Sequence, residues 1–308
     1  MNILQLPMLL FLIFLFSCSS TDVKEKKISK RNRIKKIEPT PVLKKVKEDV
    51  FRYQVKNLKI RPGEVVKLDL NNPSISDKGK IQCKNKEIPF IKVNDIVTFY
   101  VSESYFSNLL PFTCDYFFDD GQKVEMAKFK VEIKKFPFEK LNVNKKKVFY
   151  SKRDLKRIIK EKKELDIIYS NGSREPFFNE SFKIPLRSKV TSIYGTRRIF
   201  NNNKKSQHLG TDYRARIGHP IRSSNSGMVV LSKNLFFSGN TVILDHGMGV
   251  FTLYGHLSKS IAKVGQLIGK NELLGAAGMT GRVTGPHLHW GVKVHGQWVD
   301  GDSLVDQI

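Results

Sequence analysis

The sequence predicts a mainly β protein: a small β-sandwich-like amino-terminal domain, a connector helix and a carboxy-terminal antiparallel β domain. Three observations support this fold class. Short runs of alternating apolar and polar residues recur from residue 51 onward, as in half-buried strands. Glycine-containing turns separate these runs. One segment, residues 151–165, instead has the periodicity of a helix.

Residues 1–17 resemble a secretory signal peptide. Met8–Phe16 is a run of nine apolar residues, too short to cross a bilayer as a helix but suited to the core of a signal. The run ends in Leu15-Phe16-Ser17-Cys18, which resembles a lipobox, where cleavage precedes a cysteine that then receives lipid. We expect a lipid anchor at Cys18, although no Lys or Arg precedes the run and Phe16 is bulky for this motif. The alternative is an ordinary cleaved signal, with Cys18 discarded.

Residues 18–49 predict a basic tether that holds the rest of the chain away from a membrane. The segment is rich in Lys and Arg and contains Pro39 and Pro41, so it cannot bury enough apolar surface to offset the entropy of ordering. The whole chain has a net charge of +25, which favours anionic partners such as nucleic acid, anionic lipid or cell wall. No segment resembles a nucleic-acid module, so we expect no nucleic-acid partner. A basic surface that is merely solvated fits the charge equally well.

Residues 50–138 predict the small β domain. Val65–Leu70 and Lys128–Ile133 alternate as strands do, and the segments 61–63 and 119–121 are turn signals. Cys83 and Cys114 lie in this domain. If Cys18 carries lipid, these two form an even pair in an oxidising compartment and we expect a disulfide, with two buried free thiols as the alternative.

Residues 139–183 predict a connector that contains one helix, Ser151–Leu165. Ser151 and Asp154 fit a capping box, in which each side chain bonds the other residue's backbone. The apolar residues Leu155, Ile158 and Ile159 fall on one face, which we expect to be the packed one. After this helix, Asn171-Gly172 breaks the regular structure of the chain.

Residues 184–308 predict a second β domain with a concentration of histidine. Six of the seven histidines lie between His208 and His289. Strand-like runs occur at residues 229–231, 241–244 and 290–294, separated by glycine turns.

Two motifs in this domain suit a metal. His208 and Asp212 form His-x-x-x-Asp, and His287 and His289 form His-x-His, which in a strand projects both imidazoles from one face while Leu288 faces the core. A His–Asp–His set suits Zn²⁺ and leaves a fourth position for water. Each motif alone is weak evidence, since surface or hydrogen-bonded core histidines are common.

A hydrolase also needs a base and a group that stabilises a developing oxyanion. No His-Glu-x-x-His motif is present to supply a glutamate. The spare histidines His256 and His287 could fill these roles.

About residues 192–300 resemble the M23 family of lysostaphin-like metallopeptidases. The resemblance is carried, in order, by Tyr194-Gly195-Thr196-Arg197-Arg198, Gln207-His208-Leu209-Gly210-Thr211-Asp212, Asp245-His246-Gly247, Thr252-Leu253-Tyr254-Gly255-His256-Leu257 and Gly281-Arg282-Val283-Thr284-Gly285-Pro286-His287-Leu288-His289-Trp290. It implies a compact antiparallel β domain with one zinc per chain in an open groove. It also implies His208, Asp212 and His289 as zinc ligands, and His256 and His287 as the catalytic histidines.

The remaining histidines are expected to have no catalytic role. His246 lies in an Asp-His-Gly turn that the family shares, where it is not a ligand, so we interpret it as structural. His219 is assigned no role, and His295 is expected at the surface. Asp300 lacks the proline that often follows it in relatives, which affects a loop and not the site.

The resemblance implies a zinc-dependent endopeptidase that acts on peptidoglycan crosslinks. Because a Cys18-Ser19 lipoprotein resembles those sorted to the outer membrane, we expect a periplasmic, membrane-anchored enzyme that cuts D-alanyl–diaminopimelate bonds. The alternatives are a glycyl-glycine endopeptidase, a non-catalytic M23-like regulator of amidases that binds the wall, or a structural lipoprotein.

Overall fold

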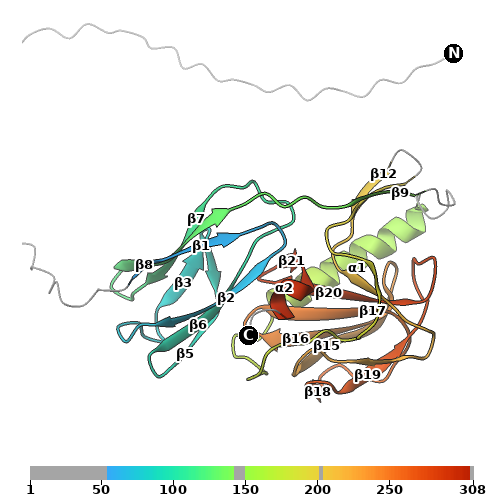
Figure 1. Cartoon of the computed structure of the whole chain (residues 1–308). Coiled ribbons are helices and arrows are strands. Elements are labelled where there is room, and N and C mark those ends of the chain that lie inside the picture. Colours follow the sequence, from blue (N-terminus) through green and yellow to red (C-terminus); the bar gives the residue numbers. More distant parts are fainter. Residues whose placement is uncertain (1–53, 142–149, 201–203, 306–308) are drawn as a thin grey trace, which may run out of the picture. The chain divides into compact units, whose positions relative to one another are not determined.

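The computed structural model describes residues 54–141, 150–200 and 204–305, all within one compact unit, residues 49–308 (Figure 1). The predicted signal peptide, Cys18 and the whole of the predicted tether belong to residues 1–53, which lie outside the described residues. Across the described ranges, neither helix is both long enough and apolar enough to cross a membrane.

The amino-terminal domain is a sandwich of two sheets, as predicted. The strands of the first sheet, in spatial order, are β1 (Lys56–Ile60), β8 (Lys123–Val131), β7 (Phe112–Phe117), β3 (Lys80–Cys83) and β4 (Lys86–Ile88). Those of the second are β2 (Val65–Asn71), β6 (Ile96–Ser102) and β5 (Phe90–Val93). Alternate residues of both sheets, such as Leu68 and Phe99 from one and Ile81 and Phe129 from the other, form a single core.

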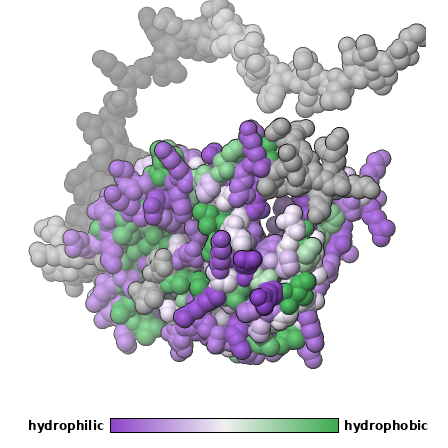
Figure 2. All heavy atoms as spheres, turned by 45° about the vertical axis from the view of Figure 1, so that its right-hand side comes forward, coloured by the Kyte–Doolittle hydropathy of each residue, from purple (hydrophilic) through white to green (hydrophobic). Residues whose placement is uncertain are grey.

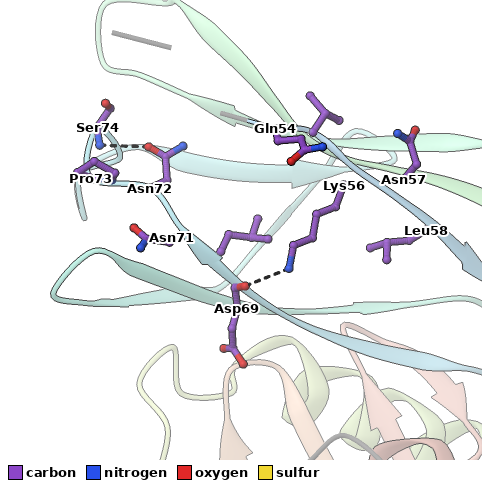
Figure 3. Close-up of a pocket in the computed structure, with 11 residues that line it drawn as sticks. Gln54, Lys56, Asn57, Leu58, Asp69, Asn71, Asn72, Pro73 and Ser74 are labelled. Atoms are coloured by element: carbon purple, nitrogen blue, oxygen red, sulfur yellow. Dashed lines mark hydrogen bonds between the residues drawn. The ribbon is translucent and has the colours of Figure 1, made fainter. Parts of the chain in front are cut away.

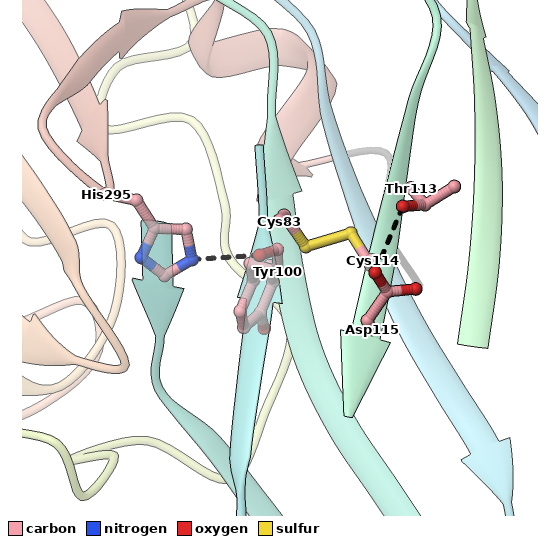
Figure 4. The surroundings of a disulfide bond; sticks show 6 residues. All are labelled: Cys83, Tyr100, Thr113, Cys114, Asp115 and His295. Carbon is pink, nitrogen blue, oxygen red and sulfur yellow. Dashed lines mark hydrogen bonds between the residues drawn. A yellow bond between two sulfur atoms is a disulfide. The ribbon is translucent and has the colours of Figure 1, made fainter. Parts of the chain in front are cut away.

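The two cysteines of this domain are joined. Cys83 on β3 and Cys114 on β7 are direct partners in the antiparallel ladder, and their sulfur atoms form a disulfide (Figure 4). The predicted bond is therefore confirmed in the structure.

The carboxy-terminal domain is built on a ten-stranded sheet, which confirms the mainly β fold class. Its main path runs through β10 (Val190–Ser192), β13 (Thr211–Arg214), β20 (His287–Val294), β17 (Val250–Ser260), β16 (Gly239–Gly247), β15 (Gly227–Leu235) and β18 (Leu267–Ile268). Branching from this path are β14 (Pro220–Arg222), β19 (Leu273–Ala277) and β21 (Gln297–Val299).

The central strands of this sheet are buried on both faces. On β16, Val242 and Leu244 contribute to the main core of the domain, whereas Ile243 between them joins a second cluster. The second cluster is completed by Leu165 and Ile168 of helix α1 (Lys152–Ser170). The helix therefore covers the face of the sheet opposite the main core. A second, short helix, α2 (Gly301–Val305), follows β21.

Helix α1 differs from its prediction in length and in its packed face. Ser151 caps it and forms the predicted capping box with Asp154, but the helix continues five residues past Leu165 to Ser170. The predicted apolar face is wrong for two of its three residues, because Leu155 and Ile159 are 44% and 55% exposed, whereas Ile158 is half-buried. Packing instead uses the last turns of the helix.

The buried residue of α1 is Glu161, which no apolar pattern indicates. Its carboxylate accepts hydrogen bonds from Arg157 Nε (2.6 Å) and from the backbone N–H of Phe236 (2.8 Å). These bonds compensate for the burial of the charge.

The two β domains share a core. Val65 and Tyr100 of the amino-terminal sandwich belong to the same cluster of buried side chains as Trp290 and Val294 of the carboxy-terminal sheet. Ser102 Oγ donates to Val294 O (3.1 Å). His295 was expected at the surface, but its side chain is half-buried and its Nε2 donates to Tyr100 O (2.9 Å; Figure 4), so that expectation was wrong.

A third sheet links the connector to the carboxy-terminal domain. Its strands are β12 (Lys204–Gln207), β11 (Arg197–Phe200) and β9 (Phe138–Leu141). Strand β9 comes from the segment between the two domains and pairs in parallel with β11, whose other neighbour, β12, directly precedes His208. The connector thus enters the structure beside the candidate site.

Candidate metal centre

The ladder of the large sheet places four residues of adjacent strands in one row. Ser192 on β10 is the partner of Asp212 on β13, Asp212 is the partner of His289 on β20, and His289 is the partner of Gly255 on β17. His256 follows Gly255. Residues far apart in the sequence thereby reach one point of the sheet.

Two side chains of this row, Asp212 and His289, converge with His208 on a point where a metal could bind. Asp212 Oδ1 lies 3.0 Å from His208 Nε2 and 2.8 Å from His289 Nδ1, and the two ring nitrogens are 3.2 Å apart. Among the described residues these three form the one group of His, Cys, Asp and Glu side chains with potential ligand atoms this close together. Two imidazole nitrogens and a carboxylate oxygen are the donors that Zn²⁺ takes in sites with an open fourth position.

The ionisation of Asp212 suits a metal ligand. Burial by itself raises the pKa of this carboxyl, but hydrogen bonds from His208 and His289 outweigh burial and bring the pKa below its ordinary value. The carboxylate is therefore charged, as a ligand of a metal cation has to be.

A backbone carbonyl fixes the orientation of His208. Its Nδ1 lies 3.1 Å from Ile193 O, which can only accept, so Nδ1 carries a proton and Nε2 is the nitrogen that would offer its lone pair to a metal. A hydrogen bond of this kind on the outer nitrogen is the usual support of a metal-binding histidine.

Comparison with known proteins identifies this part of the chain. Residues 206–301 match the family model described as Peptidase family M23. The chain carries a peptidase M23 domain. A crystal structure from Pseudomonas aeruginosa that is assigned to peptidase M23 aligns with 80% of this chain and 95% of its own, with a TM-score of 0.63 and 26% identity.

Curated relatives match over the M23 domain. The peptidoglycan DD-endopeptidase ShyA of Vibrio cholerae is 37% identical over 122 residues, which are 39% of this chain and 28% of ShyA. The DD-carboxypeptidase/endopeptidase Mpg of Neisseria meningitidis serogroup B is 42% identical over 131 residues, 42% of this chain and 28% of Mpg. The chain thus aligns with less than a third of the length of these relatives.

Two further histidines of the M23 domain lie beside the three candidate ligands. The ring of His256 is 5.8 Å from that of His289 and 4.7 Å from that of His287, measured between centroids. His287 Nε2 lies 3.7 Å from Asp212 Oδ1. All five residues singled out by sequence therefore gather in one place.

Carbonyl groups also orient these two histidines. The Nδ1–H of His256 donates to Thr280 O (2.9 Å), and the Nδ1–H of His287 donates to Gly285 O (2.8 Å), so in each neutral ring Nε2 is the nitrogen with a lone pair. His256 holds this position with a backbone φ of +60°, a left-handed conformation that costs a non-glycine residue free energy and that often occurs at functional sites.

Burial keeps His256 neutral. Burial, together with the nearby His289 and His287, lowers the pKa of His256 to about 3. The outer residues of the set remain open to solvent, since the side chains of His287 and His289 are 17% and 19% exposed. A neutral, buried imidazole thus faces a site that a substrate can reach.

One hollow of the described residues lies elsewhere. It is a cleft of about 840 Å³ in the amino-terminal domain, between β1 and β2, and Figure 3 shows its mixed lining, which includes the amide side chains of Gln54, Asn57 and Asn72. Lys56 crosses it and donates to Asp69 O (3.3 Å). Its lining residues include no histidine and no pair of carboxylates.

The histidines that were given no catalytic role lie apart from the centre. His246 is fully buried and bonds Ser226 O (2.6 Å) and Thr252 Oγ1 (2.7 Å), which agrees with a structural role. His219 is exposed in the turn before β14.

Two further residues, for which the sequence motifs indicate no role, lie at the centre. Ser192 Oγ lies 3.2 Å from His208 Nδ1, and Arg198 Nη2 lies 3.7 Å from Asp212 Oδ2. Arg198 belongs to the Tyr-Gly-Thr-Arg-Arg segment, which helped to carry the family resemblance. This segment was the one sequence signal that could have pointed to Arg198.

Proposed function

We propose that this chain is a zinc-dependent endopeptidase that hydrolyses the peptide crosslinks of peptidoglycan, with His208, Asp212 and His289 as the ligands of one zinc per chain. The observation that carries the proposal is the convergence of these three donor atoms beside His256 and His287. A bound zinc would polarise a substrate carbonyl and lower the pKa of a coordinated water.

The residues around the metal position have distinct tasks in this proposal. His256 is neutral with Nε2 free, so it can accept the proton of the attacking water. His287 approaches Asp212 from the more exposed side and, when protonated at Nε2, can stabilise the negative charge that develops on the carbonyl oxygen. Both rings are held by backbone carbonyls, which limits reorganisation during the reaction.

For the substrate we propose D-alanyl–diaminopimelate crosslinks. Two kinds of support agree. Relatives such as ShyA are named peptidoglycan DD-endopeptidases. The predicted compartment lies beneath an outer membrane, where walls are usually crosslinked directly. The net charge of +25 favours capture of a wall rich in carboxylates. Figure 2 shows hydrophilic side chains over much of the visible face, with only small apolar areas between them.

Digestion of purified, directly crosslinked wall tests this substrate. Mass spectrometry should show dimeric muropeptides converted to monomers, with the glycan strands intact. Persistence of the dimers together with cleavage of pentaglycine substrates would replace the proposal by a glycyl-glycine endopeptidase.

Zinc analysis separates an enzyme from a non-catalytic regulator of amidases. The purified chain should hold about one zinc, and Asp212→Ala should lose both the metal and the activity. Full hydrolysis by metal-free protein would refute the metal mechanism, and zinc binding without any hydrolysis would favour the regulator.

We further propose that lipid on Cys18 anchors the enzyme in the periplasm, at the outer membrane. The lipobox-like segment and Ser19 support this location. Cys18→Ala should release the protein from the membrane fraction or leave its signal uncut. Unchanged membrane attachment of that variant would exclude lipidation at Cys18.

A further inference from the structure

Arg198 lies next to two candidate zinc ligands without being a ligand itself. Its Nη2 donates to Ser192 Oγ (2.6 Å) and lies 3.7 Å from Asp212 Oδ2. The other oxygen of Asp212, Oδ1, is the one that faces His208 and His289. The two oxygens of Asp212 therefore face different groups: Oδ1 faces the metal position and Oδ2 faces the guanidinium of Arg198.

Ser192 extends this contact to His208. The hydroxyl lies 3.2 Å from His208 Nδ1, while its own position is fixed by the bond from Arg198 and by the ladder that pairs Ser192 with Asp212. One guanidinium thus borders two of the three ligands, directly for Asp212 and through a buried serine for His208.

Arg198 is itself held by the connector between the domains. Arg198 on β11 and Glu139 on β9 are register partners in the parallel ladder, and Arg198 Nε lies 3.2 Å from Glu139 Oε2. The guanidinium fork can serve Glu139 through Nε and Ser192 through Nη2 at the same time, because its donors diverge in one plane.

We propose that Arg198 is a positioning residue that holds Asp212 and His208 in the geometry for zinc, and that Glu139 on β9 holds Arg198. The inference rests on the zinc site of the proposed function. It adds two residues outside the ligand set, and both lie outside the matched region 206–301.

The positive charge of Arg198 and its hydrogen bonds to the site are expected to affect zinc affinity in opposite directions. A cation near the site would by itself weaken the binding of a dication, so its removal would tighten zinc binding. Glu139 offsets that charge at 3.2 Å, which leaves the orienting hydrogen bonds as the larger effect. We therefore expect removal of Arg198 to weaken zinc binding.

The experiment compares Arg198→Gln with Arg197→Gln in the full chain. Arg197 is the matched control, because it lies on the same strand but is exposed and packs over the ring of Phe138 instead of the centre. Zinc affinity is measured by competition with a chromophoric chelator, and the visible spectrum of the Co²⁺-loaded protein reports ligand geometry.

Arg198→Gln should bind zinc about 10–100-fold more weakly than the control and should alter the Co²⁺ spectrum, as expected when an outer partner of a metal ligand is lost. Glu139→Gln should shift zinc affinity in the same direction. If Arg198→Gln does not fold, Arg198→Lys against Arg197→Lys takes its place, since a single ammonium cannot reproduce the fork.

Equal affinity and an unchanged Co²⁺ spectrum in the Arg198 variant would overturn the inference, as would tighter zinc binding. The two proposals fail in distinguishable ways. Absence of zinc binding by the unmodified chain would refute the proposed function, whereas equal zinc binding by the unmodified chain and the Arg198 variant would refute this inference alone.

Discussion

Gly210 lies against the imidazole of His289. A Cβ atom on Gly210 would be 2.5 Å from His289 Cε1 and 2.7 Å from Nε2, closer than real Cβ contacts allow, and the carbonyl oxygen of Trp290 would be 2.7 Å away. The glycine between His208 and Asp212 is thus required by the ring that approaches from β20.

Gly210→Ala should therefore displace His289 and remove the metal. We expect zinc content to fall from about one per chain to a small fraction of that, with a corresponding loss of hydrolysis. Elemental analysis of the purified variant provides the measurement. Gly285→Ala is the control, because a Cβ there meets nothing within 4 Å, and it should keep its zinc. Normal zinc in Gly210→Ala would show that the ring can move without loss of the site.

His256→Ala should separate catalysis from metal binding. Removing a general base typically lowers the rate by about 10²–10⁴-fold. The variant should retain zinc, because His256 bonds Thr280 O and not the ligand atoms. Turnover and zinc content are measured on the same preparation. A folded variant that arrives without zinc would mean that His256 is a ligand.

His246 should make stability depend on pH. Burial lowers the pKa of His246 to about 4, below its ordinary value near 6.5, so the unfolded chain takes up a proton in this interval that the folded chain does not. The contribution of His246 to the free energy of unfolding should be complete above pH 6.5. It should be lost as the pH drops toward 4, which lowers the free energy of unfolding by up to about 3 kcal/mol. Urea unfolding of wild type and His246→Gln across this range is the test. A pH slope equal in both proteins would contradict the assignment.

The Cys83–Cys114 disulfide should stabilise the amino-terminal sandwich. The two cysteines are 31 residues apart, for which the chain-entropy model gives about 3–4 kcal/mol. Replacing both by Ser should lower the free energy of unfolding by about that amount, and reduction of the wild type should give the same value. Thiol titration of unfolded, unreduced protein should find neither cysteine free; two reactive thiols would remove the bond from this account.

The burial of side chains could be predicted from the sequence wherever it follows the two-residue alternation of a strand. Leu288 is fully buried between His287 and His289, as the alternation of a strand requires, and the turns and the capping box at Ser151 follow from residue type. These features depend on neighbours in the chain, so a single sequence carries them.

Features that depend on distant partners could not be predicted. The roles of Arg198 and Glu139 arise from the parallel pairing of β9 with β11, and Glu161 is buried because the segment at Phe236 supplies a donor. His295 is half-buried because another domain packs on it. In each case the local residue types favour a solvated side chain, and only the tertiary contact reverses that preference.

The shared core has a consequence for any attempt to move the M23 domain into another protein. A fragment cut at residue 184 would lose Val65 and Tyr100, and part of the core that they share with Trp290 and Val294 of β20 would face water. The same strand carries His287 and His289 at its other end. The amino-terminal sandwich is therefore part of the scaffold of the M23 domain, and a portable fragment has to include both domains.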